Sequence, residues 1–388
     1  FATVLAVSLY AQTPSYSNVD YVGKGSSKQM MDIYVPTGIT TPAPLIVHIH
    51  GGAFKAGSKG EVASFSKFYN NGYICADINY RLSSDSVWPA QLYDIRTAIR
   101  FLKVNSAKYG IDTNRIGLIG ESAGGHLVSI LGTTGNYEQM QGFHLGSVGA
   151  TSKVHAVVDL FGPTNFLVMD GNEGLGCSSA NHNAANSPES LLLGCALPTC
   201  PDRVASADPM TYLDAADPAF FVSCGDSDCL VAPYSSVLFD SMLTVKQVPH
   251  VFELIPGGMH GGSFWHNSAQ DTKYLNFFNK YLIGVTGVEK SESELMNFKL
   301  IGNFPNPFNP TTTIQFSATH PWVAEIHVYN VLGEFVFGEM LVCSTVGLQS
   351  FEFDASHLTS GTYIYTINYA TAVGGKFLTK AGKMNLLK

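Results

Sequence analysis

Short apolar runs alternate with helix-like segments from about residue 20 to residue 283. The apolar runs cover residues 45–50, 73–79, 115–119, 154–160, 219–223 and 251–255. The segments between them have helical spacing, as in 89–102, where a proline opens the first turn and the apolar residues share one face. Another aromatic-rich amphipathic segment, 272–283, closes the region. This alternation predicts an α/β domain whose mostly parallel sheet is doubly wound, with helices on both faces.

The pattern changes twice along the rest of the chain. Residues 170–208 interrupt the alternation with a segment rich in Gly, Asn, Ser, Ala, Cys and Pro, and its cysteines favour an ordered lid or binding loop. Residues 284–298 have the composition of a linker. Beyond them, short alternating runs at 313–316, 324–329 and 361–367 predict a small all-β sandwich over 299–388.

Composition limits the class of protein. The chain has 388 residues, enough for two or three domains, and its 45% hydrophobic fraction supports a large core. Only 13% of residues are charged, about half the usual share, which is common among secreted proteins. The net charge of -8 argues against a nucleic-acid partner. No apolar run reaches the roughly 20 residues of a membrane helix.

The first eleven residues resemble the apolar and cleavage regions of a signal peptide. A basic start and an initial Met are missing, so we interpret 1–11 as a truncated signal peptide; a first β-strand is the alternative. Seven cysteines occur, and in an exported protein an odd count leaves at least one free thiol. Cys75, inside an apolar run, is expected to be that buried thiol. We also expect two of Cys177, Cys195 and Cys200 to pair.

Ser122 is the candidate nucleophile. It lies in Gly-Glu-Ser-Ala-Gly at 120–124, the Gly-x-Ser-x-Gly pattern of a serine at a sharp strand-to-helix turn. An apolar run precedes it and a helix-like run begins after it, as the pattern requires. The flanking glycines leave room around a serine held at positive φ. An ordinary glycine turn is the alternative.

A second glycine turn follows the apolar run 44–50. His50, Gly51, Gly52 and Ala53 resemble the loop that holds the oxyanion in lipases and esterases. The expected donors are the backbone N–H groups of Gly52, Ala53 and Ala123, while His50 is expected to orient the loop. By itself the stretch would predict only a tight turn.

A serine nucleophile needs a base, and the base needs an acid that orients it. The best base is His260, directly after the apolar run 251–255, whereas His250 would lie at the wrong end of that strand. The best acid follows the run 219–223, where Asp226 and Asp228 occupy one strand-end loop. His48 and His126 are expected to be structural, and His266 lies further from the strand end.

Residues 20–283 resemble the α/β-hydrolase esterases of the hormone-sensitive-lipase and feruloyl-esterase-like group. The matching segments, in chain order, are 50–54, 77–82, 89–91, 109–112, 115–117 and 120–126. The acid loop of this group reads His-Gly-x-x-Asp-x-x-Val-Pro, which implies that Asp228 is the acid. Cys224 replaces the histidine of that pattern, and Cys229 is a further departure. These two cysteines flank the loop and suggest a disulfide between them.

The tail resembles the C-terminal sorting domain of the type IX secretion system. The matching segments are 303–314, 328–333, 360–363 and 380–388. The resemblance implies export from a Bacteroidetes-type cell, with the secretion machinery as the partner of residues 299–388 and a secreted or cell-surface location. A carbohydrate-binding sandwich is the alternative.

Together these features predict a secreted serine carboxylesterase that needs no metal or other cofactor. Its expected substrates are small or polymer-borne esters, such as acetyl or feruloyl esters of plant polysaccharide, other short-acyl or aromatic esters, or a polyester. Phe54, Trp88 and Trp265 are candidates for the pocket wall, with the core as the alternative. A serine peptidase of the prolyl-oligopeptidase type and a non-catalytic adhesin on a hydrolase scaffold are the competing hypotheses.

Overall fold

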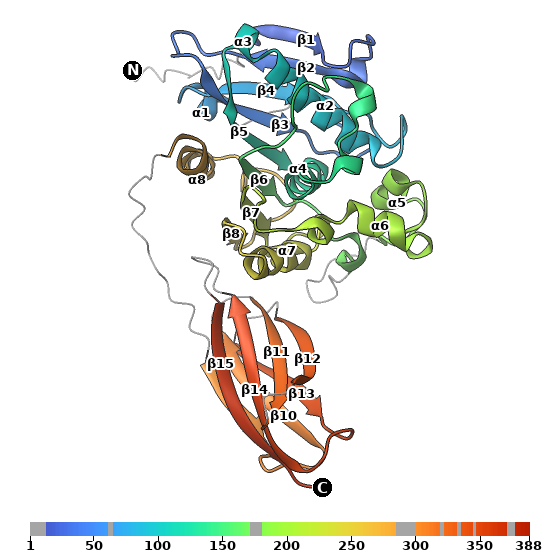
Figure 1. The fold of residues 1–388 in the computed structure, drawn as a ribbon, viewed down its shortest axis with the longest axis vertical. Helices are drawn as coiled ribbons and strands as arrows, with labels where there is room; N and C mark the ends of the chain where they lie inside the picture. The colour runs from blue at the N-terminus through green and yellow to red at the C-terminus, as the bar shows by residue number, and fades with distance from the viewer. Residues whose placement is uncertain are drawn as a thin grey trace, which may run out of the picture.

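The protein is described by a computed structural model that covers residues 13–60, 65–170, 181–284, 299–318, 322–331, 335–343, 347–370 and 377–388 (Figure 1). The predicted signal-peptide segment 1–11, residues 285–298 of the predicted linker, and Cys177 lie outside the described residues. Within the described residues, no helix is both long and apolar enough to cross a bilayer.

The first domain is built on a sheet of eight strands in the order β1-β2-β4-β3-β5-β6-β7-β8, counted over the described residues. All pairs from β4 to β8 are parallel, and β1 and β2 join antiparallel at one edge. The strands are β1 Tyr16–Asp20, β2 Met30–Tyr34, β3 Ala43–Ile49, β4 Ile74–Ile78, β5 Ile111–Glu121, β6 Ala156–Leu160, β7 Ala219–Gly225 and β8 His250–Ile255. The predicted mostly parallel sheet is confirmed, and β1 and β2 are additions that the sequence pattern did not indicate.

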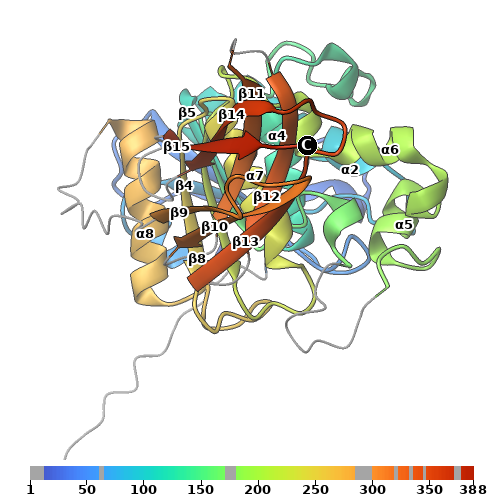
Figure 2. The ribbon, with the colours of Figure 1, turned by 90° about the horizontal axis from the view of Figure 1, so that it is seen from below.

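Helices cover both faces of this sheet (Figure 2). On β3, Leu45 and Val47 point into the core shared with α2, α4 and α7, whereas Ile46 points into the core shared with α1 and α8. The α-helices are α1 Phe65–Tyr69, α2 Ala90–Val104, α3 Ser106–Tyr109, α4 Ala123–Thr133, α5 Pro188–Leu193, α6 Pro201–Ala207, α7 Pro233–Val245 and α8 Ser268–Phe278. Alternate burial of this kind is what a doubly wound sheet requires.

Short helical turns complete the connections of this domain. The 3-10 turns are Ser27–Gln29, Glu138–Met140, Phe143–Leu145, Phe166–Val168, Leu197–Thr199 and Pro209–Tyr212, and a π-turn, Asn279–Ile283, extends α8. Helix α8 begins at Ser268 because Asn267 caps it, its side chain accepting the N–H groups of Ala269 and Gln270. The helix therefore starts four residues before the segment 272–283 that the sequence pattern indicated.

The cysteines follow the sequence predictions in part. Cys195 and Cys200 form a disulfide within the insertion, and Cys75 is a buried free thiol, as predicted. The predicted bridge between Cys224 and Cys229 is wrong, because Cys224 is a buried free thiol while Cys229 is disulfide-bonded elsewhere. The two cysteines do not pair because the Cys224 side chain, which lies in β7, points toward the start of α7, near the Pro233 carbonyl.

Residues 299–388 form an all-β sandwich, which confirms the second part of the predicted fold class. Within the described residues, one sheet has the order β13-β10-β9 and the other the order β12-β11-β14-β15, and all pairs are antiparallel (Figure 1). The strands are β9 Lys299–Phe304, β10 Thr311–Ala318, β11 Trp322–Asn330, β12 Phe335–Cys343, β13 Gly347–Asp354, β14 Gly361–Ala370 and β15 Phe377–Leu386. Side chains such as Ile314, Ile326 and Ile367 fill the space between the sheets.

Candidate active site

Ser122 lies at the sharp turn between β5 and α4. Its backbone has φ 52° and ψ −119°, a strained conformation for a residue with a side chain. The turn is tight enough to exclude side chains on both sides. A Cβ on Gly120 would lie 2.4 Å from the Gly124 carbonyl oxygen, and a Cβ on Gly124 would lie 1.9 Å from the Ile49 carbonyl oxygen. The two glycines are therefore required by contact with backbone, and the turn holds the serine above the sheet.

A continuous chain of hydrogen bonds joins Ser122, His260 and Asp228. The His260 Nε2 lies 2.9 Å from the Ser122 Oγ, and the His260 Nδ1 lies 2.7 Å from the Asp228 Oδ2. Because a carboxylate only accepts, Nδ1 carries the proton and Nε2 is free to accept the serine proton. The other oxygen of the buried Asp228 accepts the N–H groups of Leu230 and Val231, at 2.8 and 3.0 Å.

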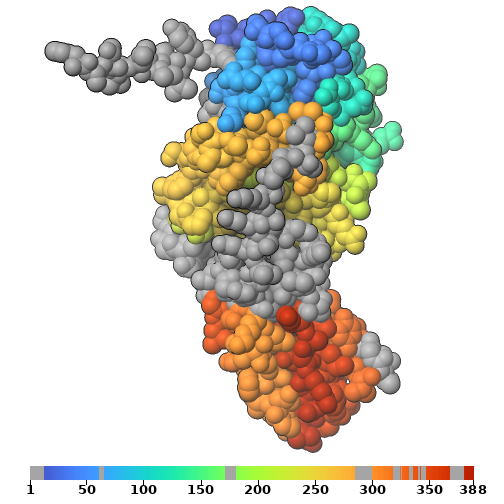
Figure 3. Space-filling model, turned by 90° about the vertical axis from the view of Figure 1, so that its left-hand side faces the viewer, coloured from blue at the N-terminus to red at the C-terminus, as the bar shows by residue number. Residues whose placement is uncertain are grey.

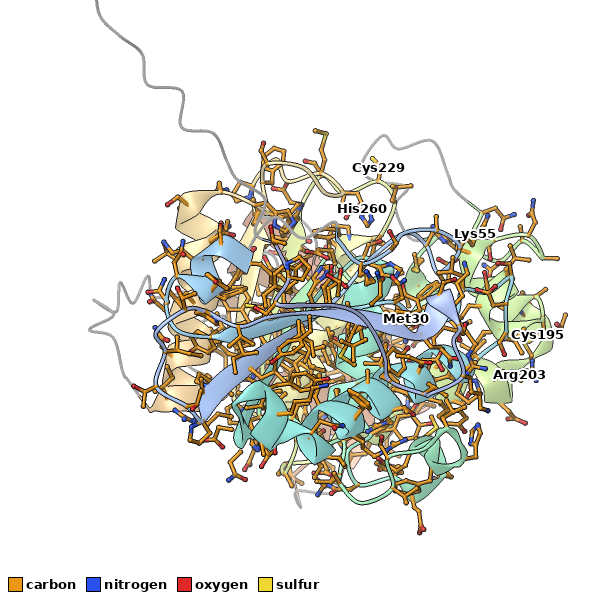
Figure 4. The ribbon with its side chains drawn as sticks, turned by 90° about the horizontal axis from the view of Figure 1, so that it is seen from above. Met30, Lys55, Cys195, Arg203, Cys229 and His260 are labelled. Atoms are coloured by element: carbon orange, nitrogen blue, oxygen red, sulfur yellow. A yellow bond between two sulfur atoms is a disulfide. The ribbon has the colours of Figure 1, made fainter. Side chains whose placement is uncertain are left out.

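These three residues come from the ends of three parallel strands of one sheet. Ser122 follows β5, Asp228 follows β7 and His260 follows β8, so all lie at the carboxyl edge of the sheet. Figure 4 shows His260 close to Cys229, the residue after Asp228. Asp226, the other acidic candidate, instead accepts the Gly257 N–H at 2.7 Å and holds the two loops together. His250 lies at the opposite end of β8 and pairs with Asp240.

The predicted oxyanion loop is a tight turn beside the elbow. Gly52 and Ala53 have φ 104° and 54°, and the Gly52 carbonyl accepts the N–H groups of Lys55 and Ala56, both at 3.0 Å. In the described part of the chain, the N–H groups of Gly52 and Ala53 have no hydrogen-bond acceptor. Ala123 is the first residue of α4, where an N–H group has no acceptor within the helix.

His50 stabilises this loop, as expected. Its Nδ1 lies 2.8 Å from the Gly51 carbonyl oxygen, and its ring stacks on Tyr80 with centroids 4.3 Å apart. The Tyr80 hydroxyl donates to the His50 carbonyl at 2.9 Å. Stacking and hydrogen bonds therefore fix the strand end from which the loop projects.

The three candidates for the pocket wall are all buried in the structure. Phe54 and Trp88 pack edge-on against the His126 ring, with centroids 5.5 and 6.2 Å away. Trp265 donates its Nε1–H to the Met259 carbonyl at 3.0 Å and packs on Phe161, whose ring contacts His260. Any effect of Trp265 on substrate is thus transmitted through the loop that carries His260.

His126 is structural, as expected. It is fully buried one turn after Ser122, and its Nδ1–H donates to the Pro163 carbonyl at 2.8 Å. Burial lowers the pKa of His126 to about 4, so the ring is neutral. Its contact with the Phe54 ring places it beside the predicted oxyanion loop.

A buried network of charged side chains below the elbow was not recognised from the sequence. His48 Nδ1 lies 2.8 Å from the Asp77 Oδ1, and His48 Nε2 lies 2.7 Å from the Glu121 Oε2. Burial alone would lower the pKa of His48, but the two carboxylates outweigh it and raise the pKa to about 10. Burial likewise acts to raise the pKa of Glu121, and the His48 charge lowers it instead.

The same network reaches the loop that carries His260. The second oxygen of Glu121 lies 3.5 Å from the Nε2 of His266. Glu121 therefore connects the elbow both to β3, through His48, and to the His260 loop. One feature of the sequence could have indicated this network: His48 and Asp77 are polar residues inside otherwise apolar strands. Across the described ranges, no three His, Cys, Asp or Glu side chains are arranged to hold a metal ion.

The parallel sheet and the elbow between β5 and α4 define the class of the first domain, which is an α/β-hydrolase of the carboxylesterase type. The chain belongs to the BD-FAE family, whose model matches residues 31–243. A second family model, the secretion system C-terminal sorting domain, matches residues 303–379. The two resemblances inferred from the sequence are both confirmed.

Individual relatives agree with this class. Esterase LipC of Mycobacterium tuberculosis is 29% identical over 237 residues, which are 60% of this chain and 57% of the relative. The solved structure of a truncated carbohydrate esterase from gut microbiota is 29% identical with a TM-score of 0.65, over 70% of this chain and 98% of that one. A bifunctional GH43-CE protein of Bacteroides eggerthii is 32% identical with a TM-score of 0.61, over 68% and 38%. The chain spans about half the length of the curated relatives it matches.

Proposed function

We propose that this chain is an exported serine carboxylesterase whose nucleophile is Ser122. The observation that carries the proposal is the unbroken hydrogen-bonded path from the Ser122 Oγ through His260 to the buried Asp228. A serine hydroxyl is a weak nucleophile unless an adjacent base takes its proton, and this path supplies the base and its orienting acid. The strained elbow presents the hydroxyl at the carboxyl edge of the sheet.

The proposed reaction has two steps. In the first, Ser122 attacks the ester carbonyl carbon while His260 Nε2 takes the hydroxyl proton. The amides of Gly52, Ala53 and Ala123 stabilise the negative oxygen, and the alcohol leaves with the proton from His260. In the second, a water molecule attacks the acyl-serine, His260 takes its proton, and the acid is released as Ser122 regains its own. Asp228 keeps His260 in the correct tautomer throughout and stabilises its charged form.

The proposed substrates are acetyl or feruloyl esters of plant polysaccharide. Two observations support this class: the solved structures of similar sequence include carbohydrate esterases, and the sorting domain would bring the enzyme to polymers outside the cell. Other short-acyl or aromatic esters, including polyesters, share the same reacting bond. Phe54 and Trp88 are proposed to shape the pocket through the aromatic cluster around His126, and Trp265 through the His260 loop.

Turnover of a simple aryl acetate by the full chain and by Ser122→Ala tests the nucleophile. We expect the variant to lose at least about a thousandfold in kcat and to lose labelling by a fluorophosphonate probe. Circular dichroism would show that the variant is folded. Turnover retained in folded Ser122→Ala would refute the role of Ser122.

A panel of substrates tests the proposed specificity. Acetylated xylan, feruloylated xylan, longer-chain aryl esters and a dipeptidyl amide would be compared at equal enzyme concentration. The proposal expects the highest kcat/KM on one of the two polysaccharide esters. Preferential cleavage of the amide would favour the peptidase hypothesis instead, and failure of every substrate together with failure to label Ser122 would favour the adhesin.

We propose that the type IX secretion machinery recognises residues 299–388 and delivers the enzyme to the cell surface or the medium. The match of the sorting-domain model to residues 303–379 supports this partner. Expression in a bacterium with this secretion system, with and without residues 299–388, provides the test. We expect esterase activity outside the cell only for the full chain; equal export of the shortened chain would contradict the proposal.

A further inference from the structure

The β-sandwich has an open seam between β9 of one sheet and β15 of the other. Both are edge strands, and over the described residues no ladder joins them. The chain after β9 closes one end of the seam, where the Phe308 N–H donates to the Asn385 carbonyl and the Leu387 N–H donates to the Phe308 carbonyl, both at 2.9 Å. Further along, over the described residues, no backbone hydrogen bond joins the outer side of β9 or of residues 380–382 to another strand. Figure 3 shows this side of the sandwich, with the orange strands lying beside the red C-terminal strand.

The seam is a groove of about 660 Å³. Tyr365 of β14 contributes to its lining. Its ring packs directly on the β15 backbone at Gly382, where an added Cβ would lie 2.1 Å from the ring. Tyr365 as a whole is 1% exposed, so the groove lies against a buried aromatic ring. The groove therefore combines the edges of two strands with a buried aromatic side chain. Unpaired strand edges are stabilised when an extended chain pairs with them.

The charge of the groove restricts what can bind. Lys299 of β9 and Lys380 and Lys383 of β15 line it, and all three are exposed. Among the described residues that line the groove, none is acidic. Lysines on edge strands oppose pairing with a basic strand or with the same edge of a second copy. They favour an acidic strand, whose carboxylates they would neutralise on both sides of the groove.

We propose that the groove between β9 and β15 is a docking site for an acidic, extended segment of a partner protein, which binds as an additional β-strand. Backbone hydrogen bonds to the open edges would provide affinity, and the three lysines would select acidic side chains. The inserted strand would span about six residues, the length of β9, and would join the two sheets across the seam. The partner's place in the secretion machinery rests on the export role proposed above, whereas the groove and its selectivity do not.

Binding of labelled peptides to the full chain, measured by fluorescence anisotropy, tests the docking site. The probe is a ten-residue peptide in which glutamate alternates with threonine and valine. Its two controls carry lysine in place of glutamate, or proline at two alternate positions that removes the donors needed for a ladder. We expect the acidic peptide to bind at least about tenfold more tightly than either control. We also expect slower hydrogen exchange at the backbone amides of residues 380–382 when it is bound.

Two charge-matched variants locate the site. The triple variant Lys299→Glu, Lys380→Glu and Lys383→Glu should bind the acidic peptide about tenfold more weakly. The control Lys24→Glu, Lys246→Glu and Lys388→Glu changes three other exposed lysines by the same charge and should bind normally. Equal loss in both variants, or equal binding of the proline-containing peptide, would overturn the proposal. Esterase activity shows whether the first domain of each variant is folded. The export test, in which residues 299–388 are removed, is a separate experiment. Failure of the docking proposal can therefore be distinguished from failure of the export proposal.

Discussion

The Glu121 Oε2 and the His48 Nε2 lie 2.7 Å apart, directly below the turn that carries Ser122. Glu121 precedes the proposed nucleophile in sequence, and His48 lies near the end of β3, two residues before His50, which supports the oxyanion loop. One ion pair thus holds together the two turns that, in the proposed reaction, would set the position of the ester carbonyl. Asp77 completes the network from the neighbouring strand β4.

Glu121→Gln should destabilise the first domain. The substitution keeps the size of the side chain but removes one of the two charges that compensate the buried His48 imidazolium. Breaking a buried pair in this way costs about 3–5 kcal/mol in the free energy of unfolding. Urea denaturation monitored by circular dichroism provides the measurement. The control Glu138→Gln, at an exposed position, should change it by less than about 0.5 kcal/mol; similar losses in both variants would contradict the role of the pair.

The stability of the domain should fall as the pH rises above neutrality. In the folded protein the pKa of His48 is raised to about 10, from an ordinary value of 6.5. The folded state therefore keeps a proton that the unfolded chain releases, so the stabilisation is complete below pH 6.5 and is lost as pH rises through about 10. Across this interval the free energy of unfolding should fall by up to about 1.4 kcal/mol per pH unit.

The matched variant for this pH dependence is His48→Asn, which cannot titrate. It should be less stable than the natural chain at pH 6.5 and should show a flatter dependence from there to pH 10. Urea denaturation at a series of pH values compares the two proteins. If the slopes were the same, groups other than His48 would account for the pH dependence.

Asp228→Asn should reduce kcat by about 10⁴-fold with little change in KM. An amide at this position can donate to His260 Nδ1, which stabilises the tautomer that cannot accept the Ser122 proton. Asp226→Asn is the matched control in the same loop, because Asp226 binds the Gly257 N–H and not His260. Steady-state kinetics on an aryl acetate should show near-normal kcat for the control. A larger loss in Asp226→Asn than in Asp228→Asn would reverse the assignment of the acid.

Gly124→Ala should prevent the elbow from forming. The added Cβ would lie 1.9 Å from the Ile49 carbonyl oxygen, a contact with backbone that no rotamer change can relieve. We expect a loss of more than about 3 kcal/mol in the free energy of unfolding, measured by denaturation of whatever soluble protein is obtained. Gly149→Ala is the control, since that glycine has no positive φ and no atom within 4 Å of the new Cβ. Normal stability of Gly124→Ala would show that the turn can relax.

The sequence was most informative about the fold where strands are buried on both faces. Strands β3, β4, β6 and β7 are buried throughout and mostly apolar, because helices cover both sides of the sheet, and such runs are easily recognised. Strands β1 and β2 were missed because they are short and include polar residues such as Asn18 and Asp32. The start of β5 was placed four residues too late for the same reason, since residues 112–115 are polar.

The candidate site could be predicted where its residues follow strands in a fixed order, and not where they depend on strand pairing. Ser122, Asp228 and His260 were proposed from motifs and chain order; the structure brings them together, and their catalytic roles remain predictions. The network of His48, Asp77 and Glu121 could not be predicted in this way. His48 meets Asp77 only because β3 and β4 pair in parallel with these residues in register. The predicted Cys224–Cys229 bridge was wrong because the spacing of two cysteines does not reveal which way a strand residue points.

The disulfide at Cys229 relates the order of the proposed acid's segment to the redox state of the compartment that holds the chain. Cys229 directly follows Asp228, so its bond fixes the segment that positions the proposed acid. Thiols are kept reduced in the cytoplasm, and disulfides persist only in oxidising compartments. We therefore expect the newly synthesised polypeptide to hold its acid on an untethered segment until it has left the cytoplasm. Synthesis of the enzyme and completion of its catalytic machinery would then be separated in both time and space.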